Sequence, residues 1–257
     1  MSVLRSRENP RVKRWTRLVA DTRLRRTEGR CLIEGPHLVG ALLEHGLKPL
    51  AMLASESALE RKEIANLIRR AGLNPAVLSE SVFRSIVDAE TPPGIAAEIA
   101  IPEVKAASAH TVFLEGIQDS SNVGAIVRSA AAFGVGIVVL DAKCADPWSP
   151  KALRAGMGGH FLLAIREVRS LAEEVERFRG KLVCAVSHGG DDLRQAKLSD
   201  PIGWIFGSEG AGVSEPLQEK SALRVTIPMA PGSESLNVAA AAAICLYHSF
   251  SRPGAGS

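Results

Sequence analysis

The sequence predicts an α/β protein made of two α/β units that are joined by a short linker. Apolar segments of strand length alternate with amphipathic helical segments along most of the 257 residues, which is typical of strand–helix–strand folds. Residues 102–110 (PEVKAASAH) interrupt this alternation, because they are rich in Ala, Ser and charged residues and lack a hydrophobic period. With 46% hydrophobic and 23% charged residues, the chain can form two modest cores.

We therefore expect a basic leader and a small domain over residues 1–101, a linker over 102–110, a larger domain over 111–251 and a flexible tail over 252–257. In the small domain the hydrophobic pattern predicts strands at 31–34, 49–54, 76–78 and 95–101. Helices are expected between them at 36–45, 59–71 and 80–87. The second of these helices ends before Gly72, a residue type that is common just after helix ends.

The larger domain begins with the apolar strand 111–116 (TVFLEG) and continues to alternate strands with helices. Its further expected strands are 135–140, 161–165, 181–187, 203–207 and 223–229. Continuous apolar strands that are separated by helices predict a parallel sheet with helices on both faces.

Positive charge is concentrated at the start of the chain. Residues 1–30 hold ten Lys or Arg against three acidic residues, although the net charge of the whole chain is only +3. Such a block favours binding to a phosphate backbone. Its candidate RNA-binding residues are Arg11, Lys13, Arg14 and Trp15, whose ring could stack on an unpaired base. The alternative is a solubilising basic helix in which Trp15 and Leu18 pack on the body of the protein.

Several classes of protein are disfavoured. The four cysteines lie far apart in apolar contexts, which indicates buried thiols rather than a disulfide framework or a zinc site. The six histidines form no HxH or HxxxH pair, so no metal site is expected. No apolar run approaches the ~20 residues of a membrane span. The basic N-terminus lacks the apolar core of a signal peptide, so we expect a cytoplasmic protein.

The segment 119–134 (DSSNVGAIVRSAAAFG) follows the first strand of the larger domain and contains Asn122 and Arg128. An Asn at a helix start can cap free backbone N–H groups. An Arg on an otherwise apolar helix needs an anion or an acceptor if it is buried. The alternative, a capped amphipathic helix whose Arg extends into solvent, stays open from this segment alone.

Two later segments add polar residues at the ends of strands. In 207–214 (GSEGAGVS), glycines allow close approach of the backbone to a ligand. Glu209 lies there at the carboxyl edge of the sheet, where α/β proteins bind ligands; the alternative is a simple anion near a helix start. The spacing is GxxGxG rather than the dinucleotide pattern GxGxxG.

The third segment places Ser235 and Asn237 before an Ala-rich helix with a run of five alanines, residues 239–243. Ser and Asn are ordinary helix caps, and a helix N-terminus can also receive an anion. The small residues indicate close packing against another backbone, either inside the domain or across a dimer interface.

In order and spacing these three segments resemble the signature motifs of the TrmH/SpoU-type branch of the SPOUT methyltransferases, over roughly residues 111–250. Residues 148–161 (WSPKALRAGMGGHF) resemble the helix-plus-glycine segment of this family. Residues 1–101 are similar to its N-terminal substrate-binding domain, which has an RNA-binding fold of the ribosomal-protein type. The resemblance implies a SPOUT catalytic domain with a deep trefoil knot, in a homodimer.

The implied activity is S-adenosylmethionine-dependent methylation of a ribose 2′-hydroxyl in RNA, without a metal. Ribosomal RNA is favoured over transfer RNA, because a separate N-terminal domain fits the members that act on ribosomal RNA. Three alternatives remain: a transfer-RNA enzyme, a non-catalytic RNA-binding module on the same fold, and a dehydrogenase-like enzyme. The missing GxGxxG argues against the dehydrogenase, and the presence of all five polar motif residues argues against the non-catalytic module.

The resemblance assigns roles by position. Arg128 faces the ribose hydroxyl, either as its base or, as we favour because a guanidinium has a pKa above about 12, to orient it and stabilise the alkoxide. Asn122 and Ser235 fix the phosphate and Arg128, while Asn237 and Glu209 order the cofactor loops. The implied cofactor-binding residues are Gly207, Ile227, Met229 and Leu236. Ser120 and Ser121 depart from the Pro-His pair that often precedes the Asn in this family.

Overall fold

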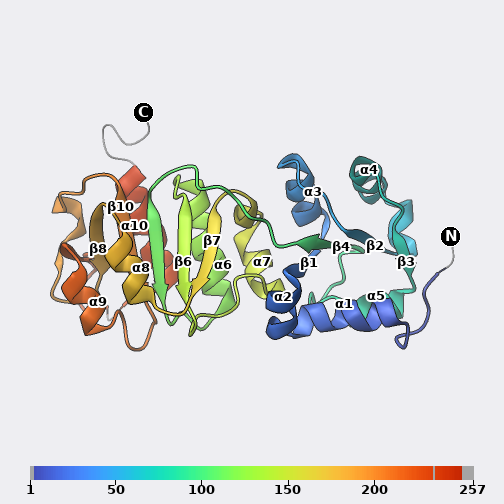
Figure 1. The fold of residues 1–257 in the computed structure, drawn as a ribbon, viewed down its shortest axis with the longest axis horizontal. Helices are drawn as coiled ribbons and strands as arrows, with labels where there is room; N and C mark the ends of the chain where they lie inside the picture. The colour runs from blue at the N-terminus through green and yellow to red at the C-terminus, as the bar shows by residue number, and fades with distance from the viewer. Residues whose placement is uncertain (1–2, 234, 251–257) are drawn as a thin grey trace. The chain divides into compact units, whose positions relative to one another are not determined.

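The computed structural model describes residues 3–233 and 235–250, which divide into two compact units (Figure 1). The first unit contains Met1–Glu103 and Trp148–Phe161, and the second contains Val104–Pro147 and Leu162–Ser257. The break at residues 103 and 104 lies inside the expected linker. The expected tail over 252–257 lies outside the described residues.

The segment Trp148–Phe161 differs from the predicted boundaries, because it packs with the first unit although it lies between two strands of the second. It contains helix α7 (Pro150–Gly156). Arg154 of this helix pairs with Glu34 at 3.3 Å and with Asp88 at 2.5 Å. Hydrophobic spacing along the chain cannot reveal such a pairing, since its partners are 120 and 66 residues away.

The first unit has a four-stranded mixed sheet in the order β1-β4-β2-β3. Strand β4 is antiparallel to both of its neighbours, whereas β2 and β3 are parallel. The elements are β1 (Arg30–Glu34), β2 (Ala51–Ser55), β3 (Ala76–Leu78), β4 (Ile95–Ala100), α1 (Pro10–Ala20), α2 (Thr22–Glu28), α3 (Pro36–Glu44), α4 (Lys62–Ala71) and α5 (Glu80–Ile86). Helices α1 and α5 cover one face, and α3 and α4 cover the other (Figure 1). The helix expected over 59–71 is two helices, because a 3-10 turn (Ser57–Glu60) precedes α4.

The second unit has a seven-stranded sheet in the order β7-β6-β5-β10-β8-β11-β9. Every strand pair in it is parallel, which confirms the expected sheet. The strands are β5 (Thr111–Glu115), β6 (Ile137–Asp141), β7 (Ala164–Val168), β8 (Lys181–Ala185), β9 (Asp191–Asp192), β10 (Ile202–Gly207) and β11 (Leu223–Thr226). The short β9 was not predicted. Strand β7 begins three residues later than expected, because Gly159–Phe161 forms a buried 3-10 turn.

Helices cover both faces of this sheet. Helices α6 (Ser120–Ala132) and α10 (Val238–Phe250) lie on one face, and α8 (Leu171–Arg177) and α9 (Glu215–Lys220) on the other (Figure 1). Along β5, Val112 and Leu114 join the core under α6 and α10, while Phe113 joins the core under α8 and α9. Because the strands are parallel, the loops after β5, β10 and β11 emerge at the same edge of the sheet.

The four cysteines are all buried and none forms a disulfide, as predicted. Burial raises the pKa of the Cys184 and Cys245 thiols to about 12, so both stay protonated at neutral pH. No helix within the described ranges is long and apolar enough to cross a membrane.

Candidate active site

The three polar segments meet at the carboxyl edge of the second sheet through a chain of side-chain hydrogen bonds. Asn122 Nδ2 donates to Glu209 Oε1, and Asn237 Nδ2 donates to Asn122 Oδ1 at 3.1 Å. Asn122 therefore joins residues that lie 87 and 115 positions later in the chain. One predicted site residue from each segment takes part in this chain.

Helix α6 begins differently from our expectation. Its cap is Asp119, whose carboxylate accepts from Ser121 N at 2.6 Å. The hypothesis that Asn122 caps this helix is wrong, because Asn122 lies in the first turn and its amide is used by Glu209 and Asn237. Capping by Asp119 thus leaves the Asn122 side chain available for contacts between loops.

Helix α10 begins as predicted. Asn237 Oδ1 accepts from Ala239 N at 2.9 Å and from Ala240 N at 3.3 Å, so this residue caps the Ala-rich helix. Its Nδ2 simultaneously holds Asn122. Ser235 is exposed in the loop before the cap.

The turn after β10 is tight enough to require glycine at its first position. A Cβ at Gly207 would lie 2.0 Å from the carbonyl oxygen of Gly212. The turn closes through a hydrogen bond from Gly212 N to Ser208 O at 2.8 Å. Glu115, at the end of β5, accepts from Ser214 N at 2.7 Å and so fastens the end of the turn to the neighbouring strand.

A cavity of about 330 Å³ lies beside this turn. Its wall includes the four predicted cofactor-binding residues Gly207, Ile227, Met229 and Leu236, together with Glu209 and Ser235. The volume falls within the range of about 300–1,000 Å³ that is typical of small-molecule sites. The wall combines apolar side chains and glycines with a few polar groups, which is typical of small-molecule sites.

Sequence reasoning missed further residues of this wall. Ser187 and His188 follow β8, and Gln218 lies on α9. None of them belongs to a recognisable spacing pattern. A useful signal was nevertheless present for Ser187 and His188, since they follow a strand of the same parallel sheet, whose carboxyl edge collects ligand residues.

Arg128 is exposed on α6 and does not belong to the cavity wall. Within the ranges that the structure describes, no hydrogen bond or ion pair holds its guanidinium. The side chain is therefore exposed to solvent and is not a structural arginine, and the hydrogen bonds that join Asn122, Glu209 and Asn237 do not include it. Those ranges also contain no cluster of three or more His, Cys, Asp or Glu residues that could hold a metal ion.

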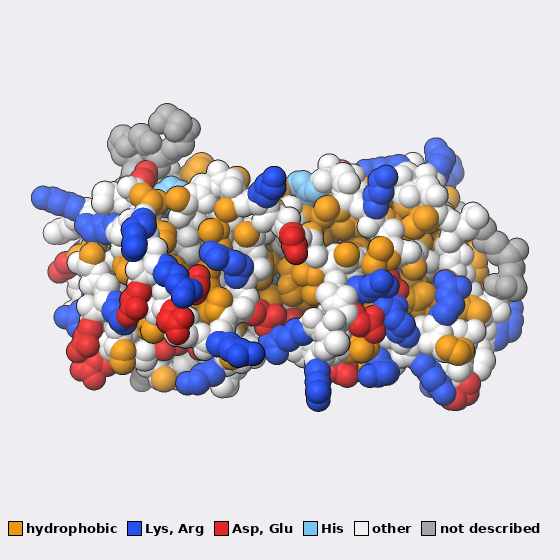
Figure 2. Space-filling view, viewed as in Figure 1, with side chains coloured by type: hydrophobic (Ala, Val, Ile, Leu, Met, Phe, Trp, Pro, Cys, Tyr) orange, Lys and Arg blue, Asp and Glu red, His pale blue; other side chains and the backbone are white. Residues whose placement is uncertain are grey.

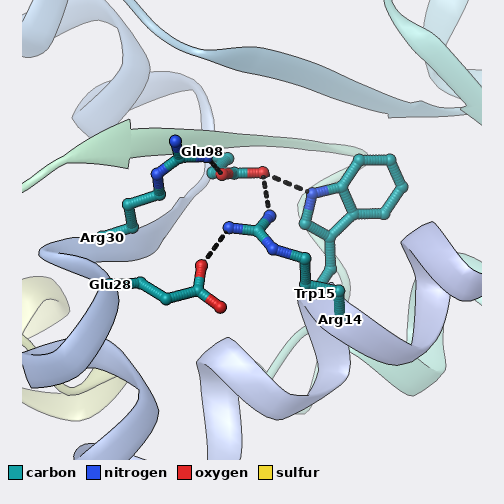
Figure 3. A network of polar contacts seen from close by, with 5 residues as sticks. All are labelled: Arg14, Trp15, Glu28, Arg30 and Glu98. Carbon is teal, nitrogen blue, oxygen red and sulfur yellow. Dashed lines mark hydrogen bonds and ion pairs between the residues drawn. The ribbon is translucent and has the colours of Figure 1, made fainter.

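The structure corrects the predicted RNA-binding role of two residues in the basic leader, Trp15 and Arg14. Trp15 is only 2% exposed, and its Nε1 donates to Glu98 Oε2 at 2.9 Å (Figure 3). The predicted stacking of Trp15 on a base is therefore wrong, and its packing on the body of the protein is observed instead. Arg14 is also engaged internally, with Glu98 at 2.8 Å and with Glu28.

Arg11 and Lys13 remain on the surface of α1. Arg11 lies over the Trp15 ring at 4.9 Å, and Lys13 pairs with exposed Glu8. In the view of Figure 2, Lys and Arg side chains are spread over the first unit with few acidic side chains among them. A surface of this kind attracts polyanions.

Comparisons with known proteins agree with the break between the two parts of the chain near residues 98–108. A sequence profile of the SpoU rRNA methylase family matches residues 109–247, which is more than half of the chain. A profile of the MRM3-like substrate-binding domain matches residues 9–97.

Individual relatives match over nearly the full length. The chain is 35% identical over 252 residues to the 23S rRNA (guanosine(2553)-2′-O)-methyltransferase RlmP of Bacillus subtilis, covering 96% of this chain and 99% of that protein. It is 27% identical over 254 residues to the 23S rRNA (uridine(2479)-2′-O)-methyltransferase of Streptomyces viridochromogenes, covering 93% and 88%. The crystal structure of the SpoU methyltransferase AviRb from Streptomyces viridochromogenes with AdoMet superimposes with a TM-score of 0.83 at 26% identity, covering 95% and 97%.

Proposed function

The chain belongs to the SpoU rRNA methylase family, and on this basis we propose that it transfers a methyl group from S-adenosylmethionine to a ribose 2′-hydroxyl of ribosomal RNA. The observation that carries the proposal is the hydrogen bonding of Asn237 to Asn122 and of Asn122 to Glu209, a residue that lines the 330 Å³ cavity. Both named relatives act on 23S rRNA, but on a guanosine and a uridine respectively. The fold therefore does not determine the target base.

S-adenosylmethionine, when bound, supplies a methyl group on a positively charged sulfur. The cavity residues fit this group, since Ile227, Met229 and Leu236 offer apolar contacts and Gly207 belongs to the same wall without a side chain. Glu209 places a carboxylate beside the same space.

The ribose hydroxyl is a poor nucleophile and must lose its proton during attack. Arg128 orients this hydroxyl and stabilises the alkoxide that develops, because a guanidinium donates several hydrogen bonds and keeps its charge. Asn122 and Ser235 position the adjoining phosphate and Arg128. Asn237 and Glu209 hold the loops, as their hydrogen bonds to Asn122 support.

The test is to incubate the protein with labelled S-adenosylmethionine and with ribosomal or transfer RNA from a strain that lacks the gene, and then to map 2′-O-methylated positions. Incorporation at one position of ribosomal RNA supports the proposal. Label in transfer RNA supports the transfer-RNA alternative, and RNA binding without label supports a non-catalytic module.

The first unit contributes RNA binding through the exposed cations of α1 and α2. Arg11, Arg17 and Arg23 are exposed there, in addition to Lys13. The basic residues that pair internally, such as Arg14 and Arg30, stabilise the domain instead. A ribosomal RNA substrate also implies a cytoplasmic protein.

Cofactor binding depends on the tight turn after β10. We expect Gly207→Ala to weaken S-adenosylmethionine binding about tenfold, because the added methyl overlaps the Gly212 carbonyl and the turn must shift. Isothermal titration calorimetry measures the affinity. The control is Gly40→Ala on α3 of the first unit, where the added Cβ lies in ordinary contact, 3.8 Å from Leu67 Cδ2. Equal affinity of the two variants would contradict this role of the turn.

A homodimer through α10 is part of the proposal. Ile244, Tyr247 and Phe250 are 41%, 59% and 50% exposed along this helix, and Phe133 of α6 packs against Tyr247 and Phe250 at 5.8 Å. Large apolar side chains gathered on one exposed surface favour a protein interface. The trefoil knot that the resemblance implies stays a prediction alongside the dimer.

We expect Ile244→Asp with Tyr247→Asp to convert the dimer into a monomer, because two charges at the centre of an apolar interface lose their hydration. Light scattering after size-exclusion chromatography gives the mass. Leu73→Asp is the control, since it changes an exposed leucine of the first unit. A wild-type monomer at micromolar concentration, or a dimer that survives both substitutions, argues against this interface.

A further inference from the structure

The turn that follows β6 lies against the loop that leads into the catalytic helix α6. We call residues 141–145 the β6 turn and residues 116–118 the entry loop. Only Asp119, the helix cap, separates the entry loop from the first turn of α6, where Asn122 lies. No residue of the β6 turn belongs to the motifs from which the site was predicted.

Asp141 connects these two segments through one atom. Its Oδ1 accepts from Gly116 N at 3.0 Å, from Lys143 N at 3.1 Å and from Cys144 N at 3.0 Å. The carboxylate therefore shapes its own turn and holds the first residue of the entry loop at the same time. Gly116 has a φ of 65°, so the residue that Asp141 holds adopts a left-handed backbone conformation that favours glycine.

Cys144 and Ala145 hold the next residue of the entry loop. Ile117 N donates to Cys144 Sγ at 3.3 Å, and Ala145 N donates to Ile117 O at 2.8 Å. The Cys144 thiol donates in turn to Leu114 O at 3.4 Å. Burial, together with the Asp141 carboxylate, raises the pKa of this thiol to about 12, so it remains a donor at neutral pH.

These contacts account for both N–H groups and one carbonyl of residues 116 and 117. Backbone groups with fixed partners hold a loop in one conformation. The loop after β10 receives the Asn122 hydrogen bond at Glu209, but it is also held by Glu115 and by its own internal hydrogen bond, which do not involve α6. Loss of the Asp141 contacts should therefore displace α6 and its polar residues without opening the cavity that binds the cofactor.

We propose that Asp141 is a positioning residue for methyl transfer, which sets the place of Asn122 and Arg128 through the entry loop. This inference rests on the proposed methyltransferase function. Displacement of a catalytic group by about 1 Å can cost about 100-fold in rate, even when the substituted residue lies away from the reacting atoms.

The experiment compares Asp141→Ala with Asp141→Asn, which keeps an oxygen acceptor at the Oδ1 position but loses the charge. We expect Asp141→Ala to lower kcat about 10–100-fold, with the dissociation constant of S-adenosylmethionine changed less than about threefold. Asp141→Asn should retain kcat within about threefold of the wild type. Asp191→Ala, an exposed aspartate on β9, is the control and should leave kcat unchanged.

Hydrogen exchange tests the contact without any assay of activity. The amides of Gly116 and Cys144 should lose protection in Asp141→Ala and keep it in Asp141→Asn. If Asp141→Ala does not fold, Asp141→Ser, whose side chain is too short to reach Gly116 N, replaces it in both measurements.

Three outcomes would overturn the inference. They are unchanged kcat in a folded Asp141→Ala, an equal loss of kcat in Asp141→Asn, and a loss of cofactor affinity that matches the loss of kcat. If the wild-type protein methylates no RNA, the proposed function fails, whereas hydrogen exchange still reports whether Asp141 holds the entry loop.

Discussion

Replacement of Arg128 by alanine is expected to lower kcat for methyl transfer by about 10²–10³-fold or more, because removal of one donor to a developing oxyanion has effects of this size. Cofactor affinity should stay within about twofold of the wild type, since Arg128 does not belong to the cavity wall. The protein should fold normally, because the side chain is exposed. Single-turnover methylation and calorimetric titration with S-adenosylmethionine measure the two quantities.

The control at this position is Arg128→Lys, which keeps the charge but loses the planar set of donors. We expect an intermediate kcat, because lysine attracts an alkoxide as a point charge without orienting it. Wild-type turnover in Arg128→Ala would show that this residue does not stabilise the alkoxide. A parallel loss of cofactor affinity would place Arg128 in cofactor binding instead.

Glu98→Ala is expected to lower the free energy of unfolding by about 3 kcal/mol, which is at the low end of the range for breaking a buried ion pair. Glu98 is only 4% exposed and accepts hydrogen bonds from Trp15, Arg14 and Arg30 (Figure 3). Removal of the carboxylate leaves the Trp15 N–H without its acceptor. The two guanidinium groups keep part of their hydration, which limits the loss.

Urea denaturation gives the free energy of unfolding for this comparison. Glu44→Ala, on the exposed surface of α3, serves as the control and should change stability by less than about 0.5 kcal/mol. RNA affinity provides a second measurement. If Glu98→Ala stays fully folded and stable but loses RNA binding, the cluster around Glu98 serves RNA recognition and not the fold.

The same carboxylate predicts how stability depends on pH. Burial raises the pKa of Glu98, but hydrogen bonds from Trp15, Arg14 and Arg30 outweigh this effect, and the pKa lies below its usual value. A carboxylate with a lowered pKa stabilises the folded state above the unfolded-state pKa of about 4.3, and this contribution is lost as the pH falls through the folded-state value. Glu98→Gln should therefore lose less stability than the wild type below about pH 4.3.

The sequence predicted best those features that depend on residues close together in the chain, namely strands, tight turns and helix caps. Apolar runs located the strands of the second sheet except the short β9, and the glycines at 207–212 marked a turn that no side chain can enter at Gly207. Asn237 was recognised as a helix cap, and it is one. These features depend on neighbouring residues, so they can be read along the chain.

Local patterns misled where two residues offered the same chemistry. Asp119 and Asn122 can both cap a helix, and the spacing alone does not decide between them. The carboxylate of Asp119 takes this role. The Asn122 amide was then available to connect loops that come from three separate strands.

The sequence by itself determined the family, the parallel sheet and several of the residues at the carboxyl edge, because hydrophobic period and motif order are properties of the chain. Only the tertiary structure decided how those residues pair and which basic residues face solvent. Trp15 is apolar on its ring and polar at its nitrogen, so it suits both an RNA surface and a core. Glu98, 83 residues away, accepts a hydrogen bond from the indole N–H inside the protein, and Trp15 therefore belongs to the core.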